Sequence, residues 1–363
     1  MTDSLSIILV GPLPPPAGGM ANQTRQLMML LQSEGIKVQL IQTNAPYRPA
    51  CVQSLRGLRA AFRLVPYLHQ LWSACSGAKV MHVMANSGWA WFLFVAPAVR
   101  IARMRRVPVV VNYRGGLAHE FLSKSANRVV PVLSSADAIV VPSGFLQEIF
   151  AKYSVRSQII PNVVNLEVFS PDSDVKTKAG AHIVIARNLE HIYGIDTAIR
   201  AFAIIRRKIA GARLSIAGSG PEYLQLTKLC EELGIVDSVI FMGRLEVAQM
   251  ADLYRQADVV LNPSRVDNAP NSILEALACG VPVVSTRAGG IPYLVKHEST
   301  AWLIDVDSVP EMSDGLLRVL LDESLRIMLR QNGLKLVENY SWERVKSSWL
   351  TTYKSLVNKM ERM

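Results

Sequence analysis

Cysteine is scarce in this sequence, and a long uninterrupted apolar run is missing. The 363 residues include 4 cysteines, namely Cys51, Cys75, Cys230 and Cys279. They lack the paired spacing of a zinc site, so we expect reduced thiols in a cytoplasmic protein. The most apolar window, residues 88–99, is shorter than the roughly 20 residues that a membrane span needs, and we expect a buried helix there. Residues 4–10 lack the basic leader of a signal peptide.

Acidic residues are in short supply relative to basic ones. Asp and Glu number 29 against 39 Lys and Arg, which gives a formal net charge of +10. Such a surface suits nucleic acid, an anionic membrane or an anionic substrate. Aromatic residues do not interleave with the basic ones into a stacking platform, so we expect no nucleic-acid partner. Half of the residues are hydrophobic, which is typical of a globular chain, and the length allows two domains.

Two groups of arginines in the first half of the chain are candidates to bind an anionic partner. One recurs at helical spacing within residues 51–77, and the other follows the apolar window. The two groups are Arg56, Arg59 and Arg63, then Arg100, Arg103, Arg105 and Arg106. A solvated helix face explains such groups equally well. The alternative is contact with acidic lipid headgroups, to which each charge near the surface adds about 1 kcal/mol, or with an anionic acceptor.

The stretch at residues 258–293 is typical of strand, loop, helix, strand and loop. Two carboxylates stand in it: Asp267 in the loop and Glu275 inside the helix. The backbone N–H groups at the helix start favour a phosphate; they belong to Asn271, Ser272 and Ile273. A carboxylate one turn further can accept both hydroxyls of a ribose, and the small residues 288–290 let a ligand approach the backbone. The pattern indicates a nucleotide diphosphate site.

Two other strand–loop–helix junctions suit phosphates. The strand at residues 6–10 runs into a loop with Gly18 and Gly19, although the spacing differs from the dinucleotide-binding G-x-G-x-x-G pattern. The strand at residues 182–187 ends on Arg187, whose planar guanidinium can bind phosphate with two parallel hydrogen bonds.

With its acid pair and the tail ALACGVPVV at residues 276–284, this chain resembles the retaining glycosyltransferases of family 4, which have the GT-B fold. In that family the first acid is usually Glu, whereas this chain has Asp267. The resemblance implies two Rossmann-like α/β domains of parallel sheets facing a central cleft. We expect an acceptor domain at residues 1–165, a nucleotide-sugar domain at residues 166–340, and a C-terminal helix at residues 341–363 returning to the first domain.

The resemblance also implies roles. Glu275 holds the donor ribose, Asp267 lies near the donor sugar, and Gly18 and Gly19 face the donor phosphates. Arg187 binds the diphosphate and takes up charge as the nucleotide leaves. Tyr193 stands where the family has a second cation, Lys.

Further residues are candidates for the missing positive charge and for the family's histidine. Arg244, at the position that meets the nucleotide base, and Arg265 are candidates to replace the missing lysine charge. The family has a His near the donor sugar after the strand at residues 107–112; here Arg114 takes the equivalent place and His119 follows. We therefore expect Asp267, Arg187 and His119 to be the catalytic residues, with Arg114 as the alternative to His119.

The expected activity is transfer of a sugar from a nucleotide-diphosphate sugar to a polysaccharide or lipid-linked glycan, with retained anomeric configuration and stabilisation of the leaving group. The donor is a co-substrate, and we expect no cofactor and no metal, since Asp305 and Asp307 precede a helix start that acids can cap. The inner membrane face is a possible partner surface. The alternatives are a non-catalytic nucleotide-sugar-binding partner of another transferase and a GT-B sugar-nucleotide epimerase.

Overall fold

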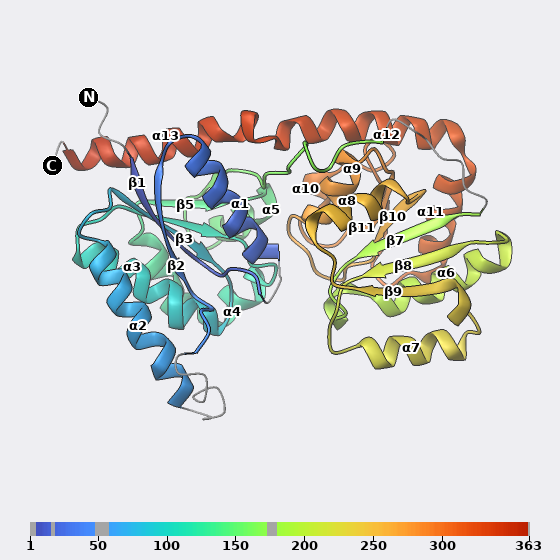
Figure 1. Ribbon diagram of the computed structural model, residues 1–363, viewed down its shortest axis with the longest axis horizontal. Helices are drawn as coiled ribbons and strands as arrows, with labels where there is room; N and C mark the ends of the chain where they lie inside the picture. The colour runs from blue at the N-terminus through green and yellow to red at the C-terminus, as the bar shows by residue number, and fades with distance from the viewer. Residues whose placement is uncertain (1–4, 16–18, 48–57, 173–179, 362–363) are drawn as a thin grey trace. The chain divides into compact units, whose positions relative to one another are not determined.

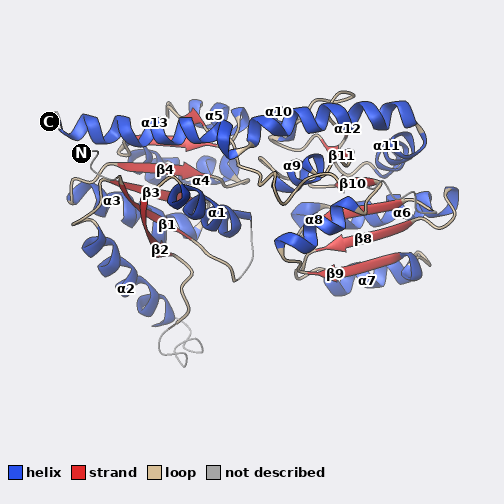
Figure 2. Cartoon of the chain, turned by 45° about the horizontal axis from the view of Figure 1, so that its top comes forward, coloured by secondary structure: helices blue, strands red, loops and turns tan. Residues whose placement is uncertain are grey.

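The computed structural model describes residues 5–15, 19–47, 58–172 and 180–361. The chain divides into two compact units. Unit 1 comprises residues 1–162 and 345–363, and unit 2 comprises residues 163–344. Each unit has its own six-stranded sheet with helices on both faces (Figures 1 and 2). All named strands pair in parallel, so the predicted α/β architecture is confirmed.

In unit 1 the strand order is β2-β1-β3-β4-β5-β6. The strands are β1 Ser6–Gly11, β2 Lys37–Gln42, β3 Val80–Ala85, β4 Val109–Tyr113, β5 Ala138–Val141 and β6 Gln158–Ile159. The helices are α1 Gly19–Ser33, α2 Leu58–Ala74, the π-helix η2 Trp91–Val95, α3 Ala96–Met104, α4 Ala118–Ser134 and α5 Gly144–Ala151. The final helix, α13, spans Trp342–Glu361, and from Val345 onward it belongs to unit 1.

Strands β3 and β4 are buried along their whole length, as expected for parallel strands covered on both faces. Successive side chains point to opposite faces, so alternate residues of these strands enter different cores. Val83 and Val111 pack with helices α2 to α5 in one core. His82 on the other face contacts Trp349 and Tyr353 of α13.

In unit 2 the strand order is β12-β11-β10-β7-β8-β9. The strands are β7 His182–Ala186, β8 Arg213–Ala217, β9 Val239–Gly243, β10 Val259–Asn262, β11 Val283–Thr286 and β12 Trp302–Ile304. The helices are η3 His191–Tyr193, α6 Ile195–Lys208, α7 Tyr223–Glu232, η4 Val236–Ser238, α8 Val247–Arg255, α9 Asn271–Ala278, α10 Ile291–Leu294, α11 Val309–Leu321, α12 Glu323–Val337 and η5 Glu338–Tyr340.

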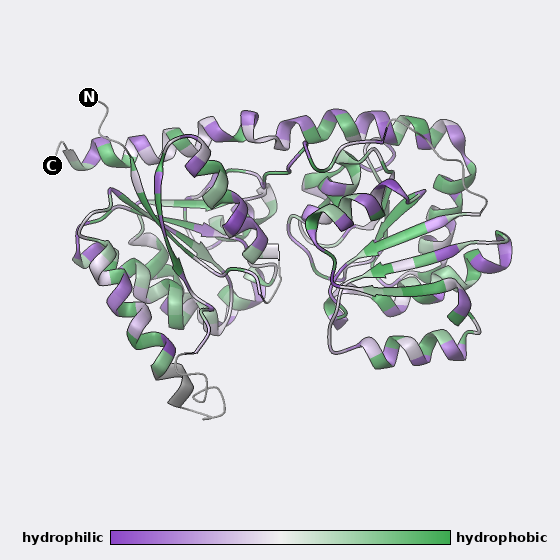
Figure 3. Cartoon of the chain, viewed as in Figure 1, coloured by the Kyte–Doolittle hydropathy of each residue, from purple (hydrophilic) through white to green (hydrophobic). Residues whose placement is uncertain are grey.

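Two apolar cores stabilise unit 2, one on each face of its sheet. Ile183 and Ile185 of β7 face α6, α7 and α11, whereas Val184 faces α8 and α9. Figure 3 shows the resulting concentration of apolar residues in the strands of each unit. Because the strands are parallel, their carboxyl ends lie on one edge of the sheet, and the loops that leave β7, β8 and β10 start there.

The apolar window at residues 88–99 forms the π-helix η2 and the start of α3, and its side chains Trp91, Val95 and Val99 are buried. The predicted buried helix is therefore confirmed. Trp89, which lies in this window just before η2, is the exception, since it is 79% exposed. Among the described residues, none of the helices combines the length and the apolar character that crossing a bilayer requires.

Candidate active site

Arg187 and Asp267 meet at the carboxyl edge of the unit 2 sheet. Arg187 directly follows β7, and Asp267 lies in the loop after β10, which pairs with β7. The Arg187 Nη2 donates to the Asp267 Oδ2 at 2.6 Å, and the side chains are only 13% and 14% exposed. Two residues that sequence analysis placed in one site therefore form a largely buried ion pair.

A group of neutral polar residues holds this pair in place. Arg187 Nε donates to Asn262 Oδ1 at 2.7 Å, and the Ser264 hydroxyl lies 3.0 Å from the same oxygen and 3.2 Å from Asp267 Oδ2. Asn262 in turn donates to the Ser285 hydroxyl. Sequence analysis missed Asn262 and Ser264. The only signal was an Asn-Pro-Ser turn directly after a buried strand.

Glu275 lies on α9 and accepts a hydrogen bond from the Tyr254 hydroxyl of α8 at 3.3 Å. Tyr254 is fully buried, and Glu275 is partly buried. Burial raises the pKa of Glu275 to about 7, although the Tyr254 hydroxyl and the charge of Arg187 act in the opposite direction. The carboxylate is thus held by one donor in a poorly solvated place, where further hydroxyl donors would stabilise its charged form. Tyr254 was not identified from the sequence.

The start of α9 offers fewer amides than predicted. The Ile273 N–H already donates to the Pro270 carbonyl at 3.2 Å. Asn271 and Ser272 are partly buried in the first turn, with no side-chain cap from Pro270. The backbone of the glycine-rich loop packs on the loop before α9, because the Gly290 N–H donates to the Asp267 carbonyl at 3.0 Å.

Two glycines are required by close backbone contacts next to Arg187. A Cβ on Gly218, whose φ is +151°, would lie 1.9 Å from the Arg187 carbonyl oxygen. A Cβ on Gly194, whose φ is +60°, would lie 2.4 Å from the Pro263 carbonyl oxygen. These contacts bind the loops after β7, β8 and β10 together, and they explain the glycines of this loop system physically.

Tyr193, which stands where the family has a lysine, lies beside the pair of Arg187 and Asp267. Its ring centroid is 5.3 Å from the Arg187 Cζ, which is a cation–π distance. Burial raises the pKa of its hydroxyl, with the charge of Arg187 lowering it and that of Asp267 raising it. At neutral pH Tyr193 therefore contributes an aromatic face and a neutral hydroxyl.

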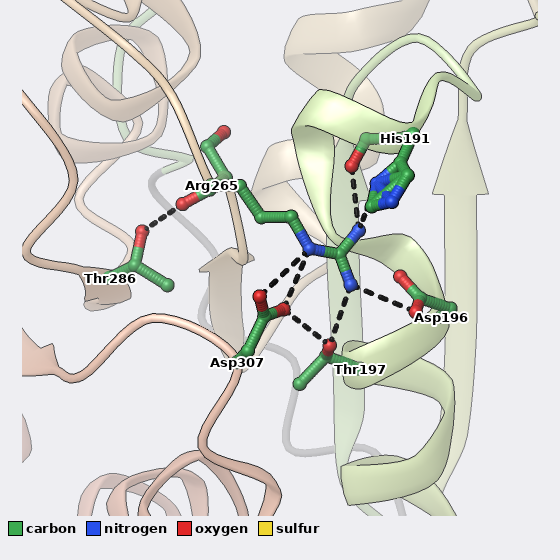
Figure 4. A network of polar contacts seen from close by, with 7 residues as sticks. His191, Asp196, Thr197, Arg265, Thr286 and Asp307 are labelled. Atoms are coloured by element: carbon green, nitrogen blue, oxygen red, sulfur yellow. Dashed lines mark hydrogen bonds and ion pairs between the residues drawn. The ribbon is translucent and has the colours of Figure 1, made fainter.

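Arg265 is engaged in a network of its own, drawn in Figure 4. Its Nε donates to Asp307 at 2.7 Å, its Nη2 to Asp196 at 2.9 Å, and its Nη1 to the His191 carbonyl at 2.6 Å. Two carboxylates already bind this one guanidinium, and they raise its pKa against the effect of burial. The expectation that Arg265 supplies the missing lysine charge is therefore not supported by the geometry.

Arg244 remains the other candidate for that charge. It is exposed after β9, and its Nε donates to the Ser219 hydroxyl at 2.8 Å. Ser219 lies between Gly218 and Gly220, in the loop that contacts the Arg187 backbone.

Asp305 and Asp307 bind arginines. Asp305 pairs with Arg287 at 2.6 Å and Asp307 with Arg265. In the part of the chain that the structure describes, no group of three or more His, Cys, Asp and Glu residues could hold a metal ion.

The predicted residues of unit 1 are more dispersed. Gly18 lies outside the described residues. Gly19 begins α1, and a Cβ there would meet no atom within 4 Å. His119 is exposed in the first turn of α4. Arg114 is partly buried directly after β4, where it donates to Asn112, Gln23 and Asn162. Of the two alternatives, Arg114 is the one fixed by neighbouring side chains.

Solved structures of other proteins share the fold of this chain. The chain superposes on sucrose-phosphate synthase from Thermosynechococcus elongatus with a TM-score of 0.77 and 21% identity, covering 98% of this chain and 100% of that one. It superposes on Anabaena HepE, in complex with UDP and glucose, with a TM-score of 0.74 and 17% identity, covering 96% and 99%. The predicted GT-B fold is confirmed.

Family models then place the chain within this class. Residues 171–336 match the glycosyl transferases group 1, and residues 17–168 match glycosyltransferase family 4. This chain belongs to the group 1, family 4 type of glycosyltransferases, as its acid motif predicted.

Curated relatives carry a range of names. One is the N-acetyl-alpha-D-glucosaminyl L-malate synthase of Bacillus anthracis, 31% identical over 46% of this chain and 43% of that protein. Another is a GDP-mannose-dependent phosphatidylinositol monomannoside mannosyltransferase of Mycobacterium tuberculosis, 26% identical over 69% of each. The match thus spans less than half of the first relative.

Proposed function

We propose that this protein transfers a sugar from a nucleotide-diphosphate sugar to a polysaccharide or lipid-linked glycan acceptor, with retention of the anomeric configuration. The observation that carries the proposal is the buried pair of Arg187 and Asp267 with Glu275 nearby on α9. A charged nitrogen for a diphosphate and a carboxylate for a ribose diol occur together at the sheet edge where α/β folds bind ligands.

The chemistry follows from the charge that the departing nucleotide carries. As the bond to the sugar breaks, negative charge develops on the diphosphate, and a fixed guanidinium stabilises it without reorganisation. Arg187 is fixed in this way by Asn262 and Asp267. Glu275 would orient the nucleotide through its ribose, and Asp267 would lie near the sugar. We assign no metal or cofactor to this step.

Names of related proteins support a nucleotide-sugar donor but leave its base open. The mycobacterial relative is named for GDP-mannose, and HepE was solved with UDP-glucose. The named acceptors include malate and a phosphatidylinositol mannoside. These names do not fix which nucleotide sugar and which acceptor this chain uses.

A lipid-linked acceptor is favoured by the surface of α2 and α3. The exposed apolar side chains Phe62, Val65, Leu68 and Trp72 follow one stripe of α2. Arg105 lies over the Trp72 ring at 4.9 Å. Aromatic and apolar residues beside arginines suit an anionic membrane surface. Arg56 lies outside the described residues, and Arg63 lies over the Tyr47 ring at 4.0 Å instead of facing solvent alone.

A second function, a non-catalytic nucleotide-sugar-binding partner, is favoured by one observation. Tyr193 occupies the place of the family's lysine. Of the two arginines considered for that charge, Arg265 is neutralised by Asp196 and Asp307, and Arg244 is exposed with its Nε bound to Ser219. With fewer positive charges on the leaving group, binding could persist without turnover.

A thermal-shift panel of UDP-, GDP- and ADP-sugars tests the proposal, because a ligand that binds only the folded state raises the melting temperature. We expect one base to stabilise the protein, Arg187→Gln to remove that effect, and exposed Arg207→Gln to keep it. Nucleotide release with glycan acceptors then separates the transferase from the binding partner. Absence of a shift with every nucleotide sugar would contradict both functions.

A further inference from the structure

Arg114 is an unusual arginine for its position. It lies at the carboxyl end of β4 in unit 1, partly buried, and donates to three amide oxygens. Nε donates to Asn112 Oδ1 at 3.2 Å, and Nη1 donates to Gln23 Oε1 at 3.0 Å and to Asn162 Oδ1. Among the described residues these contacts use Nε and Nη1, and none of them uses Nη2.

All three partners of Arg114 are neutral. None of the ion pairs found among the described residues includes Arg114, whereas Arg187 and Arg265 each bind carboxylates. A charge withdrawn from water without a counter-ion destabilises the folded state. In accordance with this, burial lowers the pKa of Arg114 to about 10. The folded protein therefore maintains a cation whose charge no carboxylate of the described residues compensates.

A buried polar chain behind Arg114 fixes its orientation. Because Asn112 Oδ1 accepts from Arg114, the Asn112 Nδ2 faces His82 Nε2, 3.1 Å away. His82 Nδ1 lies 2.7 Å from the Tyr353 hydroxyl of α13. Burial and the charge of Arg114 lower the pKa of His82 to about 3. His82 is therefore neutral and accepts from Asn112 at Nε2, which leaves the Nδ1 proton for Tyr353.

The two glycines that follow Arg114 differ in the space around them. A Cβ on Gly115 would lie 2.6 Å from both Asn86 Oδ1 and Ser87 Oγ, so the loops after β3 and β4 pack tightly there. At Gly116 an added Cβ would meet no atom within 4 Å. The loop after β4 is thus closely packed at Gly115 and has open space at Gly116.

We propose that Arg114 is a binding residue for a phosphoryl group of a ligand, which supplies the counter-ion that the protein omits. Asn112, His82 and Tyr353 act as positioning residues for it. The identity of the ligand rests on the proposed function: the phosphoryl group belongs either to the donor diphosphate or to an anionic acceptor. A planar guanidinium suits either source.

Titration calorimetry of the full chain with inorganic phosphate and with UDP tests this. We expect Arg114→Gln to weaken phosphate binding about tenfold or more, Arg114→Lys to retain part of it, and exposed Arg128→Gln to match the wild type. If Arg114→Gln also weakens UDP binding, the donor supplies the group; if UDP binding is unchanged, the acceptor does. Wild-type affinity of Arg114→Gln for both probes would overturn the proposal.

A second variant keeps the test valid should Arg114→Gln fold poorly. Asn112→Asp places a carboxylate of nearly the same shape beside Arg114 Nε, and His82 can then donate from Nε2. We expect this variant to melt no lower than the wild type and to lose phosphate binding. Undiminished phosphate binding by Asn112→Asp would show that a missing counter-ion is not the reason for the site. Arg187→Gln serves as the separate measure of the donor site, since its effect on UDP does not depend on Arg114.

Discussion

Arg187 of unit 2 and Arg114 of unit 1 occupy comparable places and differ in their partners. Each directly follows a strand of a parallel sheet, and each is held by an asparagine of a neighbouring or the same strand. Arg187 has a carboxylate, Asp267, at 2.6 Å. Among the described residues, the partners of Arg114 are amide oxygens.

This difference indicates how each site responds to an anion. In unit 2 an incoming phosphate meets a guanidinium that Asp267 already neutralises, so the empty site is stable and the ligand shares the guanidinium with that carboxylate. In unit 1 the empty site retains an uncompensated charge, and an anion would stabilise the fold directly. Changing one partner of an arginine at a time tests this difference.

The largest effect is expected from Arg187→Gln. This change removes the guanidinium from the phosphates and leaves Asp267 largely buried without its partner, which costs about 3 kcal/mol of unfolding free energy. We expect UDP affinity to fall about 100-fold, measured by calorimetry, with Arg207→Gln unchanged. A loss of less than fivefold would remove Arg187 from the donor site.

The next effect concerns the pH dependence of stability at Glu275. Its pKa in the folded state is about 7, raised from 4.5. The folded state therefore binds more protons than the unfolded state between these values, and the free energy of unfolding falls as pH rises from 4.5 to 7. The expected loss is about 3 kcal/mol, at 1.36 kcal/mol per unit.

Denaturant unfolding of the wild type and Glu275→Gln between pH 4.5 and 8 measures this effect. The unfolding free energy of the variant should lack the fall between pH 4.5 and 7 that Glu275 causes, so the variant should be more stable than the wild type at pH 8. It should also bind UDP about tenfold more weakly. Exposed Glu231→Gln should keep the wild-type slope. If the unfolding free energies of the wild type and Glu275→Gln fall equally with pH, the pH dependence does not come from Glu275.

Asp267→Asn makes unit 2 resemble unit 1, because Arg187 would then contact only amide and hydroxyl oxygens. We expect UDP to bind several-fold more tightly, since no carboxylate competes for the guanidinium, and the unfolding free energy to fall by about 1–2 kcal/mol. If nucleotide binding weakens instead, Asp267 does not compete with the diphosphate.

The smallest effect is expected from Tyr193→Lys. The added charge should strengthen UDP binding a few-fold, while the cation–π contact with Arg187, worth about 0.5–1 kcal/mol, is lost. Nucleotide release should rise if the natural Tyr limits leaving-group stabilisation. Unchanged release together with unchanged affinity would show that the position does not contact the phosphates.

The sequence predicted the members of the unit 2 site better than their arrangement. Arg187, Asp267 and Glu275 stand out because strand ends, short loops and helix starts are local patterns. Their partners are not local: Arg187 and Asp267 are 80 residues apart, and Asn262 and Tyr254 carried no motif. Arg265 is the clearest example of what the sequence did not predict, since only the fold shows that Asp196 and Asp307 already bind it.

By itself, the sequence determined the alternation of buried strands with amphipathic helices, the family, and the glycines and acids that mark the loops, because these depend on spacing along the chain. The tertiary structure alone decided which charges are compensated. Asp267 reaches Arg187, whereas no carboxylate in the described part of the chain reaches Arg114, and His82 meets Tyr353 across 271 residues. Such pairings depend on how strands are ordered in each sheet, and in a low-dielectric interior they set the energy of every charged group.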